Sequence, residues 1–316
     1  MRTMKKFVLV IAMLLAAVAA QGQVRVEIKF DGEQFIANEP LMAHVRIMND
    51  SGVTLRLGDD PEWIGFAIET MEGPYVRQLR LPNILGAFQL ESSHTATKHV
   101  DLAPCFNLVH AGKYKIVATV KVPAFKTSFA SPSQVFYIVT GSRMWEKQFG
   151  VPPNVAPADA NGLPELRKYM LIQALSGKET RFYVRVTDAQ ENNIRVIPIG
   201  TLISFSKPEP QIDKWSNLHV LYQIGARSFV YAVVNPNGLL IAREIHEITD
   251  TRPTMTETDE GRIMIKGGAR RPSVDDIPPF DAALLPDPIP QTNAPATNQP
   301  AGKKAAAANA KDKKKS

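Results

Sequence analysis

The densest group of residues that could do chemistry lies between positions 215 and 231. It contains Trp215, His219, Tyr222, Arg227 and Tyr231. Aromatic rings beside a guanidinium can bind a sugar or a protein, because the rings supply flat apolar area and the arginine supplies charge and hydrogen bonds. On an exposed sheet face, Trp215, His219, Arg227 and Tyr231 are therefore candidate binding residues. The alternative is that these side chains pack against one another across neighbouring strands.

The remaining histidines and acids do not have the spacing of a metal or catalytic site. His94 and His99 are five residues apart, whereas metal ligands recur at spacings such as His-x-x-x-His or Cys-x-x-Cys. The sequence contains no Gly-x-Ser-x-Gly nucleophile motif and no glycine-rich phosphate loop. Adjacent acids such as Asp59 and Asp60 do not place two carboxylates across a cleft. We expect no catalytic residue, no metal and no cofactor, and hence a protein that is not an enzyme.

The candidate residues lie on segments that alternate between apolar and polar residues, which is typical of half-buried β-strands. Residues 24–30 place four apolar side chains on one face, and residues 114–122 repeat the pattern. Residues 218–248 predict three consecutive strands, with a hairpin turn at 235–238 in which Gly238 takes a positive φ. The fold class expected is all-β.

These patterns divide the chain into two β-rich modules. The first covers residues 23–141, and its seven to nine short strands predict a β-sandwich. Residues 142–164 are rich in proline, asparagine and glycine, so we expect a linker there. A second antiparallel β module follows at 165–270, in which residues 167–175 could form a helical turn or a strand; the following hairpin signal favours a strand.

The first module resembles a known type of domain. It has an early Trp63 on a central strand, the strand and turn "AHVRIMNDSG" at 43–52, and a Gly-x-Tyr sequence that opens the strand at 112–122. This layout resembles bacterial exported immunoglobulin-like sandwich domains, including the bacterial proteinase-inhibitor type. The resemblance covers residues 23–141 and implies a fold rather than an inhibitory activity.

The N-terminus predicts export. Residues 1–22 contain Arg2, Lys5 and Lys6, then a short apolar run and small residues suited to cleavage, which is the pattern of a secretory signal peptide. The alternative, a membrane anchor, requires about 20 apolar residues. We therefore expect a periplasmic or extracellular protein that is not transmembrane after cleavage.

The single cysteine, Cys105, cannot form a disulfide within the chain. It is either a buried apolar residue or a thiol that pairs between chains.

The C-terminal segment, residues 271–316, is first rich in proline and then in alanine and lysine, so we expect disorder. The net charge of +6 comes from the two ends: the leader carries +3 and residues 301–316 carry +5, which leaves −2 for residues 23–300. This distribution does not favour nucleic-acid binding. The tail could contact an anionic envelope polymer, or it could be a solvated segment with no partner. Its lysines are Lys303, Lys304, Lys311, Lys313, Lys314 and Lys315.

These observations predict an exported, non-enzymatic binding or structural protein of the cell envelope, with an unidentified protein or polysaccharide as its partner. The alternative is an extracellular enzyme inhibitor, or a polymer-acting enzyme that uses the second module. A deep pocket that gathers His219, Arg227 and an acid would favour the enzyme.

Overall fold

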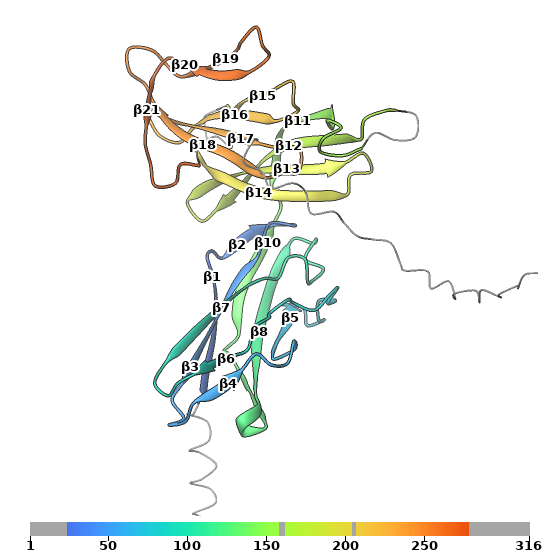
Figure 1. Cartoon of the computed structure of the whole chain (residues 1–316), viewed down its shortest axis with the longest axis vertical. Helices are drawn as coiled ribbons and strands as arrows, with labels where there is room; N and C mark the ends of the chain where they lie inside the picture. The colour runs from blue at the N-terminus through green and yellow to red at the C-terminus, as the bar shows by residue number, and fades with distance from the viewer. Residues whose placement is uncertain (1–23, 158–161, 204–206, 278–316) are drawn as a thin grey trace, which may run out of the picture. The chain divides into compact units, whose positions relative to one another are not determined.

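The computed structural model describes residues 24–157, 162–203 and 207–277. Within these ranges the chain forms β-strands and a single 3₁₀ turn, η2 (Pro123–Phe125), so the predicted all-β class is confirmed (Figure 1). The predicted signal peptide and the six candidate lysines of the tail lie outside the described residues.

The first half of the chain forms two main sheets. The strands of the first are β1 (Val24–Phe30), β3 (Met42–Asn49) and β7 (Thr95–Asp101), in that order. Those of the second are β2 (Gln34–Ile36), β10 (Gln134–Val139), β8 (Gly112–Val122) and β5 (Ile64–Thr70), with β9 (Thr127–Ala130) paired to β8. A short ribbon joins β4 (Leu55–Leu57) to β6 (Phe88–Leu90). All neighbours are antiparallel except β2 and β10.

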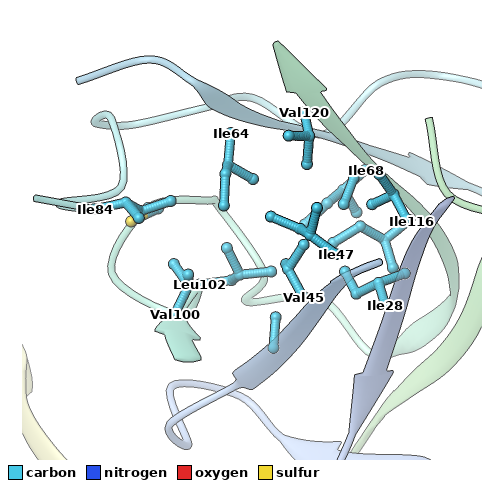
Figure 2. Packing of buried hydrophobic residues seen from close by; sticks show 14 of the residues in the cluster. Ile28, Val45, Ile47, Ile64, Ile68, Ile84, Val100, Leu102, Ile116 and Val120 are labelled. Atoms are coloured by element: carbon cyan, nitrogen blue, oxygen red, sulfur yellow. The ribbon is translucent and has the colours of Figure 1, made fainter. Parts of the chain in front are cut away.

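The core of this half follows from the alternation in the sequence. Ile28, Val45 and Ile47 from the first sheet pack in one cluster with Ile68 and Ile116 from the second (Figure 2). Each fully buried side chain of this size contributes about 1.5–3 kcal/mol relative to its exposed state. The residues that alternate with the buried ones along β1 and β8 are more exposed, and except for Val117 in β8 and Phe30 at the end of β1 they are polar or glycine.

The second half begins with a four-stranded meander. Its strands are β11 (Ser142–Gly150), β12 (Leu166–Ser176), β13 (Glu179–Asp188) and β14 (Asn193–Leu202). A five-stranded sheet follows, with β15 (Glu209–Ile212), β16 (Leu218–Gln223), β17 (Ser228–Val234), β18 (Leu240–Glu247) and β21 (Ala269–Arg271). A separate hairpin pairs β19 (Thr254–Glu257) with β20 (Ile263–Lys266).

Strands β16 and β17 are buried on both faces. Leu218, Val220 and Tyr222 belong to the cluster shared with the four-stranded meander. Leu221 and Phe229 point to the other face and pack with residues of the β19–β20 hairpin. The hairpin therefore covers a sheet face that would otherwise expose apolar side chains to water.

Two segments differ from the sequence-based expectations. The expected linker at 142–164 begins with strand β11, which pairs with β12 along its length because Trp145 and Phe149 pack into the adjoining core. The predicted start of the disordered tail, residue 271, is too early in the chain. Arg271 pairs with Ile245, and Ile277 forms a bridge with Arg243. The prolines nearby indicated a break in structure, but the open edge of β18 supplies partners for this segment. The ambiguous segment 167–175 lies in strand β12, as favoured.

Four hairpin loops of the second half share one construction. The first residue of each loop has a side-chain oxygen, which accepts a hydrogen bond from the backbone N–H of the residue four positions later. The residue immediately before that donor has a positive φ. The first residues are Asp188, Asp213, Asn235 and Thr258. This combination of a tight turn and a left-handed residue matches the twist of antiparallel strands. Gly238 has φ +73°, as predicted for the 235–238 turn.

Candidate functional site

The candidate site is built on the loop between β15 and β16, residues 213–217. The Asp213 carboxylate closes this loop: Oδ1 accepts hydrogen bonds from the backbone N–H of Trp215 at 2.9 Å and of Asn217 at 2.8 Å. Its Oδ2 accepts a third from the Asn217 amide at 2.9 Å. Ser216 takes the left-handed conformation, with φ +66°. The backbone on both sides of Trp215 is therefore held in place by one carboxylate.

Side chains of the meander fasten the same loop to the core. The hydroxyl of Tyr169, which is fully buried, donates to the backbone carbonyls of Ser216 at 3.0 Å and Val234 at 3.2 Å. The Ser216 hydroxyl donates to the carbonyl of Gly150 at 2.8 Å. Burial raises the pKa of Tyr169 far above its ordinary value, so its hydroxyl remains a donor. The loop is thus tied to two strands of the other sheet.

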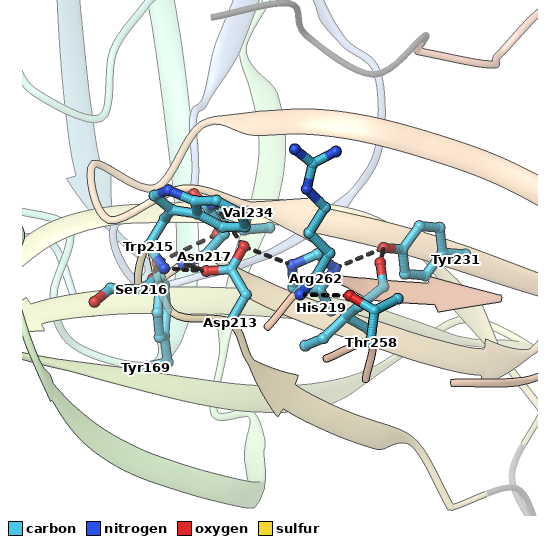
Figure 3. A network of polar contacts seen from close by, with 11 residues as sticks. Tyr169, Asp213, Trp215, Ser216, Asn217, His219, Tyr231, Val234, Thr258 and Arg262 are labelled. Atoms are coloured by element: carbon cyan, nitrogen blue, oxygen red, sulfur yellow. Dashed lines mark hydrogen bonds and ion pairs between the residues drawn. The ribbon is translucent and has the colours of Figure 1, made fainter. Parts of the chain in front are cut away.

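Behind the loop, Asp213 belongs to a buried chain of polar groups (Figure 3). Asp213 Oδ2 lies 3.1 Å from His219 Nε2, and His219 Nδ1 lies 2.6 Å from the Tyr231 hydroxyl. That hydroxyl lies 3.4 Å from the carbonyl oxygen of Ile263 on β20. Although burial raises the pKa of Asp213, hydrogen bonds from His219 and Asn217 bring it below its ordinary value.

These contacts limit where the protons of the network can lie. The ionised Asp213 requires a donor, which His219 Nε2 supplies, and His219 Nδ1 shares its hydrogen bond with the Tyr231 hydroxyl. Burial raises the pKa of Tyr231 well above its usual value, which keeps that hydroxyl protonated. Both nitrogens of His219 are engaged, and the ring is buried. The imidazole in this arrangement cannot act as a general base on an external substrate, because no free nitrogen faces solvent.

The solvent side of the loop presents an aromatic ring with two cations near it. Trp215 is 44% exposed. Lys214 Nζ lies 4.5 Å from the centre of its ring, and Arg262 Cζ lies 6.0 Å from it. Figure 3 shows the Arg262 side chain extending on the same side of the network as Trp215. We refer to Lys214, Trp215 and Arg262 as the Trp215 platform.

Arg262 reaches the platform from the loop between β19 and β20. Its backbone N–H donates to the Thr258 hydroxyl at 3.2 Å, and its guanidinium forms an exposed ion pair with Glu260 at 3.4 Å. The hairpin itself is held by the packing of Ile263 and Met255 against the β16–β17 face. The network and the platform therefore depend on the same hairpin.

The structure places the four candidate binding residues in different environments. Trp215, His219 and Tyr231 lie in or beside the network, but Arg227 lies at the opposite end of the β16–β17 hairpin, where it donates to the carbonyl of Ile248 at 2.7 Å. His219 and Tyr231 do not lie on an exposed face: they are buried beneath the β19–β20 hairpin and pack across the strands, as in the alternative interpretation of this group. Tyr222 points to the other face, where its hydroxyl bonds to the carbonyl of Ile199.

Three residues of the site escaped the sequence analysis. Asp213 and Lys214 lie beside Trp215 in a loop whose Asp-x-x-x-Asn spacing is the same as in the 188–192 loop, and this repetition could have identified Asp213. Arg262 has no local signal, because its approach to Trp215 depends on how the β19–β20 hairpin packs.

Other chemistry-bearing residues have local partners. His44 pairs with Asp31 at 2.8 Å and contacts the His99 ring edge-on at 4.6 Å. Cys105 is buried, and that burial raises the pKa of its thiol.

Within the described ranges, no group of three His, Cys, Asp or Glu side chains is placed to hold a metal ion. A search of the same residues finds no helix that is long and apolar enough to span a membrane.

An open groove of about 300 Å³ lies beside Trp63 in the first half of the chain. Two acids and two lysines line it, and the charges are largely paired: Asp60 contacts Lys121 at 3.2 Å, and Asp59 contacts Arg56 at 2.8 Å. The Trp215 platform presents an aromatic face as well as cations, and for that reason it is the stronger candidate.

Comparison with known proteins assigns no family. No protein-family model and no curated protein matches the chain. Among solved structures, the sporulation control protein Spo0M from Bacillus subtilis is similar at 7% sequence identity and a TM-score of 0.28, over 52% of this chain and 80% of that one. A likeness at this level carries no argument about fold or function.

Proposed function

We propose that this protein is an exported, non-enzymatic binding module of the cell envelope, and that the Trp215 platform is its binding surface. One observation carries the proposal: a large aromatic side chain is exposed on a loop that is held rigidly from below. Surface loops usually gain mobility from their exposure. Here Asp213, Tyr169 and Ser216 fix the loop through six hydrogen bonds.

A rigid aromatic residue favours binding because little conformational entropy is lost when a ligand docks. Immobilising a side chain that has many rotamers costs about 0.5–1.5 kcal/mol on binding, and the construction of the loop removes part of that cost in advance. Tryptophan and arginine are also the residues that most often dominate the free energy of binding at interfaces. The geometry of the platform therefore supports recognition.

The chemistry of the platform points to a sugar polymer that carries acidic groups. The indole face can stack on the apolar face of a sugar ring, while Lys214 and Arg262 can bind a carboxylate or phosphate. Arg262 already pairs with Glu260, but both side chains are exposed and the pair contributes little, so an anionic ligand can compete for the guanidinium. An acidic protein segment would use the same groups and is distinguished below by experiment.

Three further features support the wider proposal. The leader pattern at 1–22 supports export to the periplasm or the extracellular space. The strand pattern of residues 23–141 supports an immunoglobulin-like sandwich, a scaffold common among binding modules. The engagement of both His219 nitrogens, together with the distance of Arg227 from that ring along the hairpin, supports a non-enzymatic role.

The test is retention on isolated envelope material, followed by an array of glycans offered as matched acidic and neutral pairs. We expect the Trp215→Ala and Arg262→Gln variants to lose retention and binding to the acidic glycans. Leu239→Ala is the matched control, because Leu239 is exposed on the related 235–239 loop of the same sheet. Retention that Trp215→Ala leaves unchanged, or that protease treatment of the envelope material abolishes, would contradict the proposed glycan site.

The lysine tail is tested separately, since the structure does not describe it. A chain that ends at residue 300 lacks all six lysines. If the tail contacts an anionic envelope polymer, this truncation weakens retention at low salt while binding to the glycan array persists. Unchanged retention at low salt would exclude the tail from binding.

A further inference from the structure

A second surface, in the first half of the chain, exposes several large apolar side chains to solvent. It lies on the connection between β5 and β6 and consists of Tyr75, Leu79, Leu81 and Leu85, which we call the apolar rim. Their exposed fractions are 72%, 57%, 57% and 71%. Single exposed leucines are ordinary on protein surfaces, whereas larger exposed apolar patches mark interaction sites, and here four large apolar side chains are exposed within eleven residues of one connection.

The backbone of this connection is held against the sandwich. Val76 N–H donates to the carbonyl of Ile68 at 2.8 Å, and Leu79 N–H donates to that of Cys105 at 2.8 Å. Asn107 N–H donates to the carbonyl of Arg77 at 3.0 Å. Because these bonds fix the chain, the rim side chains point to solvent from an anchored backbone.

One apolar residue of the connection, Ile84, packs inward. Ile84 is buried in the sandwich core, and its carbonyl accepts a hydrogen bond from the Trp63 indole at 3.3 Å. Its neighbour Leu85 is exposed. The connection thus packs Ile84, and in part Val76, into the core while the rim side chains stay exposed.

The charged side chains between the rim residues are both arginines. Residues 75–85 contain Arg77 and Arg80 and no aspartate or glutamate, and the nearest acids in the sequence are Glu72 and Glu91. Both arginines are exposed, and in the part of the chain that the structure describes neither forms an ion pair with a carboxylate. The nearby Glu69 is engaged by Lys115 at 2.5 Å and by the hydroxyl of Tyr75.

We propose that the apolar rim docks on the surface of an anionic phospholipid bilayer. Leucine and tyrosine side chains would enter the boundary between headgroups and acyl chains, and Arg77 and Arg80 would bind lipid phosphates. The alternation of apolar and cationic side chains along one anchored segment complements such a surface, because the bilayer is apolar below and negatively charged above. This inference concerns a different surface from the Trp215 platform and does not depend on it.

The test is co-sedimentation of the chain without residues 1–22, so that the apolar leader cannot insert. The vesicles are phosphatidylglycerol mixed with phosphatidylethanolamine, compared with phosphatidylcholine alone. The triple variant Leu79→Ser, Leu81→Ser, Leu85→Ser should bind the anionic vesicles at least about tenfold more weakly, since each lost leucine removes apolar area from the contact. The control is Leu175→Ser with Leu239→Ser, which removes exposed leucines elsewhere. The lysine tail is present in every variant, so the difference between them reports the rim.

Two further measurements separate the outcomes. Arg77→Gln with Arg80→Gln should reduce the preference for anionic over phosphatidylcholine vesicles while circular dichroism stays unchanged. A fluorescent probe on Leu81→Cys should shift to the blue with anionic vesicles, which requires insertion rather than attraction through the tail. Equal binding of the rim and control variants, or no spectral shift, would overturn the proposal. So would a dimer in light scattering that the triple variant abolishes, because the rim would then bind a second copy of the chain.

Discussion

The substitution Asp213→Ala tests the central structural claim about the second half, that one buried carboxylate organises the site. The substitution removes the acceptor of two backbone N–H groups, the Asn217 amide and the His219 ring. Hydrogen bonds to a charged group contribute about 1.5–3 kcal/mol each, but the loop N–H groups can turn to water. The larger loss comes from the buried imidazole left without its partner. A buried donor left without its acceptor costs about 1–3 kcal/mol, and we expect a loss near the upper end of that range.

The chain supplies a matched control in Asp188. This residue closes the 188–192 loop with the same three hydrogen bonds, to Gln190 N–H, Asn192 N–H and the Asn192 amide, but it has no histidine behind it and is less buried. Asp188→Ala therefore removes the loop contacts alone. The difference between the two variants isolates the contribution of burial and of His219.

Urea unfolding followed by circular dichroism and tryptophan fluorescence measures both variants. The pH dependence gives an independent readout with a definite sign. Because the pKa of Asp213 is lowered in the folded state, its stabilising effect is complete above the ordinary aspartate value near 4 and disappears as the pH falls through the lowered folded value. The gap between the original chain and Asp213→Ala should therefore be widest at pH 7 and should narrow in acid.

Two results would refute this reasoning. The first is a loss below about 1 kcal/mol, or one equal to that of Asp188→Ala, because the buried pair would then add nothing beyond an ordinary loop contact. The second is a gap that stays constant between neutral and acidic pH, since that would mean that the pKa of Asp213 is the same in the folded and unfolded states.

Three further predictions concern other parts of the molecule. Tyr231→Phe removes the hydroxyl that bonds His219 and should cost about 1–2 kcal/mol in urea unfolding; an unchanged midpoint would show that the bond is absent in solution. Gly238→Ala should cost about 1–2 kcal/mol, because φ is +73° and an added Cβ would lie 2.8 Å from the Arg195 Cβ, and a neutral effect would contradict this loop geometry. The Cys105 thiol should resist iodoacetamide until urea unfolds the chain, since it is buried and burial raises its pKa; rapid native modification, measured by mass spectrometry, would contradict that burial.

Much of the fold is a local property of the sequence. Alternation with a period of two predicts a strand wherever one face is buried, and it identified β1, β8 and the three strands of residues 218–248. The 235–238 turn was also predictable, because its glycine supplies a conformation that other residues adopt at a cost. Trp215, His219 and Tyr231 could be grouped in advance since consecutive strands joined by a short turn are neighbours.

What the sequence could not decide depends on contacts between distant segments. Alternation does not say which element covers a sheet face, and the β19–β20 hairpin buries the face of His219 and Tyr231, which the sequence left open as either an exposed or a packed face. Strand pairing also placed residues 142–150 and 271–277 in strands or bridges, although the composition of the surrounding segments predicted a linker and a disordered tail. Arg262 joins Trp215 only through the packing of that hairpin. Local spacing determines which residues form strands and tight turns, because those depend on neighbours in the chain. Burial and the composition of the site depend on which surfaces pack together, and only the tertiary structure decides that.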